Sequence, residues 1–377
     1  MRVGVNTRLL LKGRLEGIGY FTQKTLSRMV KAHPEVEFVF FFDRKYSPDF
    51  IFAPNVKPVV IPLPTRHPLL WWIYFEFLLP CYLKRYKIDV LFSPDGWMPQ
   101  KPRIPTVNTI HDINFWHNSS FIKSPVMRKY YLHFFPRFAR NCNRLITVSE
   151  YSRRDLIDSF GVAEDKVDVV YNASHEIYIP LNEAEQQKVR EEYTQGKPFF
   201  YFVGALHKRK NLDNLFRAFD EFKNRTKSDV KLIIIGTLMW KDHEIEAAYN
   251  NMIFKDDVVF TGRLEADRIT RIAASSLALV FVSHFEGFGI PIVEAFASQT
   301  AVITSTTTSM PEIGGEAALY CEPTNVNQIA TAMEDIFTKP ELRAALIEKA
   351  IVQNRLFNWD KSSEKLWSSI IKAKASK

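Results

Sequence analysis

Residues 283–295, SHFEGFGIPIVEA, follow an apolar run from Leu277 to Val282. Such a run predicts a parallel strand buried on both faces. Gly287 and Gly289 then favour a tight turn with a close backbone approach to a ligand, and Pro291 suits the first position of a helix. This order of strand, glycine loop and helix N-terminus is typical of an α/β fold. It directs backbone N–H groups and the positive end of a helix dipole toward an anion.

Two carboxylates flank the loop, Glu286 within it and Glu294 about one turn into the predicted helix. Because a carboxylate beside a phosphate would repel it, we expect both side chains to face neutral hydroxyl groups. The hydroxyls of a sugar and of a ribose, together with a diphosphate, describe a nucleotide-sugar. Two glutamates with seven residues between them resemble the Glu-x7-Glu motif of the retaining glycosyltransferases of family 4. The resemblance implies that Glu286 holds the donor sugar and Glu294 the ribose. The donor-binding residues that it implies between them are Gly287, Phe288, Gly289 and Ile290.

A cluster of cations follows another predicted strand, Phe199–Val203. The sequence after this strand, GALHKRKN, leads into an amphipathic helix that begins at Leu212. Cations at the mouth of a parallel sheet can bind a polyanion, and Arg and Lys are well suited to phosphate. In family 4 an Arg-Lys-Asn segment here holds the donor diphosphate, which implies that role for Arg209, Lys210 and Asn211. Gly204 is expected at the donor as well, and Ala205 stands where some members carry a further Arg.

A third segment, Asp257–Leu264, predicts a short strand that ends in a glycine turn before a helix near Ala266. In the resembling enzymes this loop meets the nucleobase, largely through backbone groups. Arg263 and Leu264 are therefore expected near the base.

The N-terminal half offers two candidates. Gly17-Ile18-Gly19-Tyr20 opens a predicted helix, and the resemblance implies that Gly17 and Gly19 lie beside the donor. His111 ends the predicted strand Pro105–Ile110, where α/β enzymes place their chemistry. A histidine satisfied by a neighbouring backbone group is the alternative. The resemblance implies that His111 contacts the sugar or takes part in catalysis, with Asp112 orienting it.

The alternation of strands and helices runs twice along the 377 residues, which predicts two doubly wound α/β domains. The resemblance implies the GT-B fold, in which two Rossmann-like domains face each other across a cleft. We expect an N-terminal, acceptor-side domain at residues 1–175, a nucleotide-sugar-binding domain at 176–360, and a helix at 361–377 that packs back on the first domain.

The composition of the chain limits the partners and the cellular locations that we expect for it. The formal charge of +8 is spread along the chain without a nucleic-acid-binding motif. We expect no secretory signal, because the apolar residues at the start alternate as in a strand, and the apolar stretch Leu69–Pro80 is too short to span a bilayer. Three cysteines without metal-ligand spacing predict reduced thiols and a cytoplasmic location. Aromatic residues lie near cations at 71–87 and 128–137, which predicts either core helices or peripheral membrane contact.

Among the family 4 enzymes, the chain resembles bacterial mannosyltransferases of polysaccharide assembly. This resemblance implies a retaining glycosyltransferase that moves mannose from GDP-mannose to a saccharide or lipid-linked saccharide. His111, Glu286, Arg209 and Lys210 are the expected catalytic residues. No cofactor is expected, and no metal is demanded because Asp-x-Asp is absent. UDP-sugars remain an alternative donor, and a sugar-nucleotide epimerase remains an alternative activity. A dehydrogenase is disfavoured, since no Gly-x-Gly-x-x-Gly follows the first strand.

Overall fold

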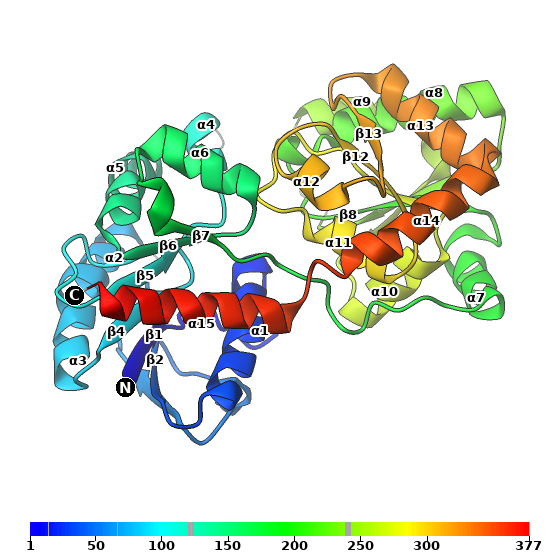
Figure 1. The fold of residues 1–377 in the computed structure, drawn as a ribbon. Coiled ribbons are helices and arrows are strands. Elements are labelled where there is room, and N and C mark those ends of the chain that lie inside the picture. Colours follow the sequence, from blue (N-terminus) through cyan, green and yellow to red (C-terminus); the bar gives the residue numbers. More distant parts are fainter. Residues whose placement is uncertain (14, 66, 120–121, 123, 238–242, 377) are drawn as a thin grey trace. The chain divides into compact units, whose positions relative to one another are not determined.

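The computed structural model describes residues 1–13, 15–65, 67–119, 122, 124–237 and 243–376, and they form two compact units. Unit 1 comprises Met1–Asn172 and Asn358–Lys377, and unit 2 comprises Ala173–Phe357. Each unit contains one wholly parallel sheet with helices on both faces (Figure 1). The predicted fold class, two Rossmann-like α/β domains, is confirmed.

The sheet of unit 1 has seven strands in the order β3-β2-β1-β4-β5-β6-β7. Most of its strand residues are buried, as expected for a parallel sheet covered on both faces, and the exposed ones lie in the edge strand Val56–Val60. Their bounds are β1 Arg2–Asn6, β2 Glu37–Phe42, β3 Val56–Val60, β4 Val90–Ser93, β5 Thr106–Thr109, β6 Arg144–Thr147 and β7 Val167–Val169.

Helices cover both faces of this sheet. Those of unit 1 are α1 Gly17–Ala32, α2 Pro68–Ile73, the π-helical turn η2 Tyr74–Leu78, α3 Leu79–Arg85, α4 Asn114–His117, α5 Pro125–Asn141, α6 Glu150–Phe160 and α15 Trp359–Ala375. The segment from α2 to α3 and helices α5 and α6 enclose an aromatic core with one face of the sheet. Helices α1 and α15 pack against each other, and α15 lies across β4, β5 and β6 (Figure 1).

Helix α15, the last helix of the chain, is fastened to unit 1 by hydrogen bonds and rings. Ser363 Oγ donates to Thr25 O at 3.0 Å, and Ser362 Oγ donates to Tyr171 O at 2.6 Å. The ring of Trp367 stacks on His33 at 3.9 Å. These contacts make α15 part of unit 1, although it follows unit 2 in the sequence.

The sheet of unit 2 has six strands in the order β10-β9-β8-β11-β12-β13. Their bounds are β8 Phe199–Val203, β9 Lys231–Ile235, β10 Val258–Gly262, β11 Ala278–Phe281, β12 Ala301–Ser305 and β13 Leu319–Cys321. The helices are α7 Glu183–Thr194, α8 Leu212–Thr226, α9 His243–Asn250, α10 Ala266–Ser275, α11 Ile290–Ala297, α12 Met310–Gly314, α13 Val326–Thr338 and α14 Pro340–Asn354, with a 3₁₀ turn, η5, at Lys208–Lys210.

Both sheets share one strand order. Numbered from its own first strand, each begins 3-2-1-4-5-6, the order of the dinucleotide-binding fold. The order reverses between β1 and β4 in unit 1 and between β8 and β11 in unit 2. Ligands of such sheets bind outside the carboxyl ends of the strands at this switch point. The loops after these four strands are therefore where a site is expected.

Candidate active site

The basic loop of unit 2 follows β8 at the switch point. It forms the turn η5 at Lys208–Lys210, and Asn211 then adopts a left-handed conformation with φ of 61°. The buried Asn211 side chain donates to Val282 O at 2.8 Å and to Pro323 O at 2.6 Å. Asn211 thus anchors the loop to the ends of β11 and β13. Both amide protons of its side chain are committed to backbone carbonyls, so the side chain positions the loop, and a contact of Asn211 with the diphosphate stays a prediction.

A glycine pair lets the ends of β8 and β9 approach closely. A Cβ atom on Gly236 would lie 2.0 Å from Gly204 O, so no other residue fits there without moving the backbone. Gly204 itself has φ of 152°, and its N–H donates to Ile235 O at 3.0 Å. Gly204 was expected at the site from the sequence, whereas Gly236 was not. A glycine directly after the apolar strand β9 was the available signal.

The central feature of unit 2 is an ion cluster formed by Glu286, Arg209 and Lys210. Arg209 Nη1 lies 2.7 Å from Glu286 Oε2, and Lys210 Nζ lies 2.6 Å from Glu286 Oε1. Arg209 Nη1 also donates to Phe285 O at 2.6 Å, and Lys210 Nζ lies 4.6 Å from the centre of the Phe281 ring. The loops after β8 and β11 are thereby joined through their charged side chains.

The electrostatics of Glu286 differ from the sequence-based expectation. Its side chain is 10% exposed, and burial alone would raise the pKa of its carboxyl. The charges of Lys210 and Arg209 outweigh that effect and lower the pKa, so Glu286 is ionised at neutral pH. We expected Glu286 to face neutral hydroxyls of a ligand, and that role stays a prediction; within the chain its carboxylate faces the two cations. The cluster keeps a net charge of one positive unit and can therefore still attract a diphosphate.

The glycine loop and the start of α11 form the other wall of this site. Gly289 is the N-cap of α11 with φ of 99°, and the helix begins at Ile290, one residue before Pro291. The backbone N–H of Glu286 donates to Thr308 Oγ1 at 3.2 Å. Ser309 Oγ donates to the carbonyls of Glu286 and Phe288 at 2.9 and 3.0 Å. Thr308 and Ser309, which shape the loop from the segment after β12, were missed because nothing in their local sequence points to this contact.

Glu294 lies in α11 in an environment unlike that of Glu286. Burial raises the pKa of Glu294 to about 8, although a hydrogen bond with Tyr178 opposes the shift. The carboxyl of Glu294 is therefore mostly protonated at neutral pH. A protonated carboxyl can donate one hydrogen bond as well as accept others, which suits a hydroxyl partner.

Two further expected residues follow β10. Arg263 is exposed and Leu264 is half-buried. The N–H of Gly236 donates to Gly262 O at 2.9 Å, which ties the end of β9 to the end of β10. Arg263 and Leu264 therefore lie at the same edge of the sheet as the ion cluster, two strands away from β8.

His111 belongs to unit 1, in the loop after β5. Its Nε2 lies 2.9 Å from Pro94 O, so this nitrogen carries the proton, and its ring meets Phe21 edge-on at 5.0 Å. Burial lowers the pKa of His111, which keeps the ring neutral and leaves Nδ1 as an acceptor. Asp112 accepts from the N–H of Asn114 at 3.0 Å. The Pro94 carbonyl, not the Asp112 carboxylate, orients His111.

The glycine loop of unit 1 opens α1 as expected. Gly17 is the first residue of the helix, and a Cβ atom on Gly19 would lie 2.8 Å from Leu9 O. The loop forms a pocket of about 400 Å³ together with Leu9, Leu11 and Ile18. Glycine at position 19 is thus required for the packing of the loop against residue 9.

Comparison with known proteins agrees with these two units. Residues 16–174 match Glycosyltransferase Family 4, and residues 183–353 match Glycosyl transferases group 1. The chain belongs to the family 4 glycosyltransferases. The two matches together cover most of the chain. The two Rossmann-like domains of this glycosyltransferase are those of the GT-B fold.

Three relatives illustrate the similarity. O-antigen chain mannosyltransferase B of Escherichia coli is 25% identical over 74% of this chain and 73% of its own length. O-antigen chain mannosyltransferase RfbU of Salmonella typhimurium is 26% identical over 77% of this chain and 76% of its own. The crystal structure of Anabaena Alr3699/HepE in complex with UDP and glucose superimposes with a TM-score of 0.74 at 15% identity, covering 98% of this chain and 99% of that one. The last comparison concerns the fold alone.

Within its described residues, the glycosyltransferase has no cluster of three His, Cys, Asp or Glu side chains that could hold a metal ion. In the same part of the chain no helix is long and apolar enough to cross a membrane. All three cysteines are described, and none forms a disulfide.

Proposed function

We propose that this glycosyltransferase transfers mannose from GDP-mannose to an acceptor saccharide with retention of configuration. The observation that carries the proposal is the ion cluster at the switch point of unit 2. Two cations, a glycine loop and the N-terminus of α11 converge there on one buried carboxylate. This combination suits a diphosphate attached to a polyhydroxylated group. The choice of mannose is supported by the names of the two O-antigen mannosyltransferases.

In the proposed reaction, the bond between the anomeric carbon and the diphosphate oxygen breaks while the acceptor oxygen bonds to the same carbon. Arg209 and Lys210 stabilise the charge that develops on the leaving diphosphate, helped by backbone N–H groups of the loop Gly287–Ile290. Such preorganised electrostatic stabilisation is commonly the largest contribution to catalysis. The acceptor hydroxyl approaches on the same face, and its proton passes to an oxygen of the leaving phosphate.

Glu286 has two roles in this scheme. Before the donor binds, its carboxylate balances Arg209 and Lys210. When the diphosphate takes over those cations, the carboxylate is released to accept hydrogen bonds from hydroxyls of the donor sugar. The exchange leaves no buried charge without a partner at either stage, which avoids a large desolvation cost.

The remaining candidate residues contact the nucleobase, the ribose or the transferred sugar of the donor. Glu294 binds the ribose, and the backbone at Arg263 and Leu264 contacts the nucleobase. Gly17 and Gly19 bring the backbone of the first glycine loop close to the donor. His111, neutral and held by Pro94 O, contacts the transferred sugar. No metal or cofactor is needed, because the paired cations neutralise the diphosphate.

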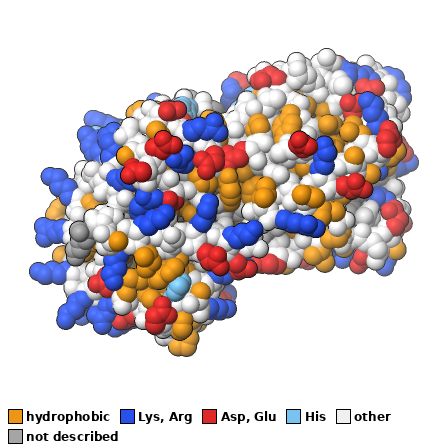
Figure 2. All heavy atoms as spheres, viewed as in Figure 1, with side chains coloured by type: hydrophobic (Ala, Val, Ile, Leu, Met, Phe, Trp, Pro, Cys, Tyr) orange, Lys and Arg blue, Asp and Glu red, His pale blue; other side chains and the backbone are white. Residues whose placement is uncertain are grey.

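The acceptor is a saccharide or a lipid-linked saccharide, and the reaction takes place in the cytoplasm, where thiols stay reduced. The chain can approach a lipid-linked acceptor through unit 1. Leu69, Trp72 and Phe77 of α2 and η2 are 57, 39 and 52% exposed. Figure 2 shows Lys and Arg side chains along the left edge of the face in view, where α3 and α5 lie in Figure 1. Exposed apolar residues beside cations support peripheral contact with an anionic membrane.

Thermal-shift titration with GDP, UDP and ADP tests the donor. A ligand that binds only the folded protein raises its melting temperature. We expect GDP to give the largest shift, since a site that hydrogen-bonds one base leaves polar groups unpaired with another. A larger shift with UDP would replace GDP-mannose by a UDP-sugar, the alternative donor, and would leave the transferase assignment intact.

Product analysis tests the reaction itself. Nucleotide-sugars incubated with lipid-linked saccharide acceptors, in the presence of a chelator, should give a glycosylated acceptor with the anomeric configuration of the donor. Conversion of the nucleotide-sugar into its epimer without transfer would instead establish the alternative epimerase activity.

A further inference from the structure

Six consecutive residues with side-chain hydroxyls, 304–309 (TSTTTS), stand at the end of β12, next to the strand that leads into the loop of Glu286. We call residues 304–309 the hydroxyl segment. Four of its hydroxyls donate to backbone carbonyls in and before that loop. The bonds run from Thr304 to Phe281 at 2.9 Å, from Ser305 to Ser283 at 2.5 Å, from Thr307 to His284 at 3.3 Å, and from Ser309 to Glu286 and Phe288 at 2.9 and 3.0 Å. The hydroxyl segment therefore forms a row of donors along the chain after β11.

The hydroxyl segment holds both backbone polar groups of Glu286. The N–H of Glu286 donates to Thr308 Oγ1 at 3.2 Å, and its carbonyl accepts from Ser309 Oγ at 2.9 Å. Ser309 is the N-cap of α12, where a serine side chain commonly accepts from the first N–H groups of the helix. The buried Ser309 makes no such cap and bonds to the loop instead. The backbone position of Glu286 thus depends on residues 308 and 309.

Thr308 has a left-handed backbone conformation, with φ of 56°. Each of the five other non-glycine residues with positive φ in the described chain follows the end of a helix or of a 3₁₀ turn, where this conformation is common. They are Lys87, Gln195, Asn211, Lys227 and Gln299. Thr308 instead lies between a strand and a helix, and its β-branched side chain strongly disfavours a positive φ. Strain of this kind persists where the surrounding structure enforces it, and it is found mostly at functional sites.

Contacts on both sides hold Thr308 in this conformation. The N–H of Met310 donates to Thr307 O at 3.3 Å, which closes a turn around Thr308, and the Met310 side chain is completely buried. Thr307 and Ser309 are themselves bonded to the loop after β11. The Thr308 hydroxyl donates to Met310 Sδ at 3.5 Å and accepts from the N–H of Glu286. The strained backbone therefore places a hydrogen-bond acceptor against Glu286.

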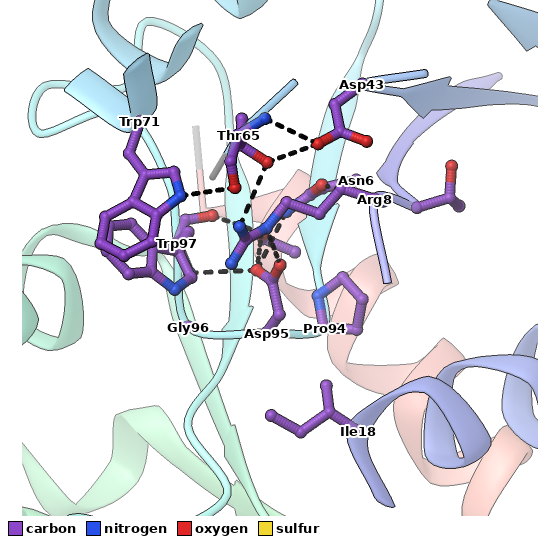
Figure 3. Close-up of polar contacts among 12 residues, drawn as sticks. Asn6, Arg8, Ile18, Asp43, Thr65, Trp71, Pro94, Asp95, Gly96 and Trp97 are labelled. Atoms are coloured by element: carbon purple, nitrogen blue, oxygen red, sulfur yellow. Dashed lines mark hydrogen bonds and ion pairs between the residues drawn. The ribbon is translucent and has the colours of Figure 1, made fainter. Parts of the chain in front are cut away.

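The loop at the switch point of unit 1 is held in a different way (Figure 3). Arg8 Nε, after β1, donates to Asp95 Oδ2, after β4, at 2.5 Å, and the Arg8 guanidinium lies 5.3 Å from the centre of the Trp97 ring. Asn6 Nδ2 and the N–H of Trp97 donate to Asp95 Oδ1 at 2.9 and 3.2 Å. The Asp95 carboxylate thus holds its own loop. The Glu286 carboxylate changes partners in the proposed reaction and cannot serve as a permanent anchor, so the hydroxyl segment takes that role.

We propose that Thr308 is a positioning residue for the transfer reaction. Its hydroxyl keeps the backbone of Glu286 in place when the diphosphate draws Arg209 and Lys210 away from the carboxylate. The assignment rests on the proposed function, in which Glu286 turns from the two cations to the donor sugar. At that stage the ion pairs no longer fix Glu286, and its backbone bonds to Thr308 and Ser309 remain.

Steady-state kinetics on the full chain test the proposal, with release of GDP from GDP-mannose in the presence of a lipid-linked saccharide as the readout. Thr308→Val keeps the β-branched shape and removes the acceptor. Its kcat should fall about three- to tenfold through the loss of one hydrogen bond. GDP affinity, measured by calorimetry, should change far less, because Arg209 and Lys210 are untouched. Thr308→Ser, which restores the hydroxyl, should recover most of the lost kcat.

Thr306→Val is the matched control. Thr306 belongs to the hydroxyl segment, but its hydroxyl bonds to Glu322 at 3.1 Å. Its substitution should leave kcat unchanged. A normal kcat in Thr308→Val would overturn the proposal, as would equal losses of kcat and GDP affinity or no recovery in Thr308→Ser. If Thr308→Val does not fold, Thr308→Gly takes its place with the same expectation, since glycine adopts a positive φ without strain.

Amide hydrogen exchange separates this proposal from the proposed function. Exchange of the Glu286 N–H, followed by NMR without ligand, should be faster in Thr308→Val than in the wild type and in Thr308→Ser, because the bond that protects it is lost. Unchanged exchange would overturn the proposal whatever the donor is. A wild type that transfers sugar from a UDP-sugar and not from GDP-mannose would refute the proposed donor, and the same comparison of kcat with that UDP-sugar would then decide the role of Thr308.

Discussion

At the switch point of unit 2, two cations share one carboxylate beside a glycine loop, whereas at that of unit 1 one cation pairs with one carboxylate under an aromatic wall. The strand order is the same in both sheets. Strand order therefore determines where a ligand can bind, and the loop residues determine what binds. The excess cation and the glycine loop of unit 2 suit a diphosphate, while the rings and the balanced ion pair of unit 1 form a cavity with a less cationic lining.

Removing a cation from unit 2 should have the largest effect. Lys210→Ala should lower kcat/KM for mannosyl transfer by about 2–3 kcal/mol, roughly 30- to 150-fold, because one group that stabilises the leaving diphosphate is lost. Steady-state kinetics with GDP-mannose measures this. Lys208→Ala is the matched control, since Lys208 lies in the same turn but pairs with Glu244. Near-normal turnover in Lys210→Ala would exclude Lys210 from the diphosphate site.

A substitution in unit 1 should lower the turnover number without changing the affinity for the nucleotide. His111→Ala should lower kcat roughly tenfold or more, as for other groups that act at the reacting sugar. GDP affinity should stay normal. The melting temperature should fall only slightly, because one hydrogen bond to Pro94 O, worth about 1 kcal/mol, is lost. His117→Ala, a nearby surface substitution, should leave kcat unchanged. A large loss of stability with normal kcat per folded molecule would make His111 a structural residue.

Glu286→Gln should change nucleotide binding and turnover in opposite directions. The carboxylate competes with a diphosphate for Arg209 and Lys210, so its neutralisation should tighten GDP binding several-fold. Turnover should fall, because the group that binds the donor sugar is weakened. Calorimetry and kinetics measure the two effects, with Glu244→Gln as the control for the neighbouring ion pair of Lys208. Weaker GDP binding in Glu286→Gln would contradict the exchange of partners.

Glu294 should affect the stability of the fold as a function of pH. Burial raises the pKa of Glu294 to about 8 in the folded protein, whereas an unfolded glutamate titrates near pH 4. The folded state therefore holds the proton more tightly, and the stability from this group, complete at low pH, is lost as the pH rises through about 8. In Glu294→Gln the side chain stays neutral, so its melting temperature should fall less than that of the wild type between pH 6 and 9. If the melting temperatures of the wild type and Glu294→Gln changed equally with pH, the prediction would be contradicted, and the Glu294 carboxyl would lie in a more hydrated environment.

The sequence predicts the parts of the site that depend on neighbouring residues. The strand before Glu286, the glycine N-cap of α11 and the helix that follows Asn211 all depend on local patterns, and the structure contains them. The ion pair between Lys210 and Glu286 joins residues 76 positions apart. Only the parallel packing of β8 against β11 brings these residues together, and no local pattern records it.

Contacts between residues far apart in the sequence also explain the other differences between the predicted and the observed site. Asn211 bonds to Pro323 across 112 positions, so its structural role is invisible in the Arg-Lys-Asn segment. The aromatic residues of α2, η2 and α5 suggested either core or membrane contact. Trp71, Tyr74 and Phe75 are buried in the core, while Tyr131 and Phe135 line a cavity of unit 1. Sequence periodicity predicts that such rings face inward but not that a cavity lies beside them.

Calorimetric titration of GDP tests most directly the claim that unit 2 binds the donor at its switch point. The wild type and Thr147→Val, a buried substitution in unit 1, should each bind one GDP per chain with equal affinity. Arg209→Ala should lose this binding, because it removes the cation that pairs with Glu286 and lies against the loop after β11. Wild-type affinity for GDP in folded Arg209→Ala would contradict the account, since the nucleotide would then bind elsewhere.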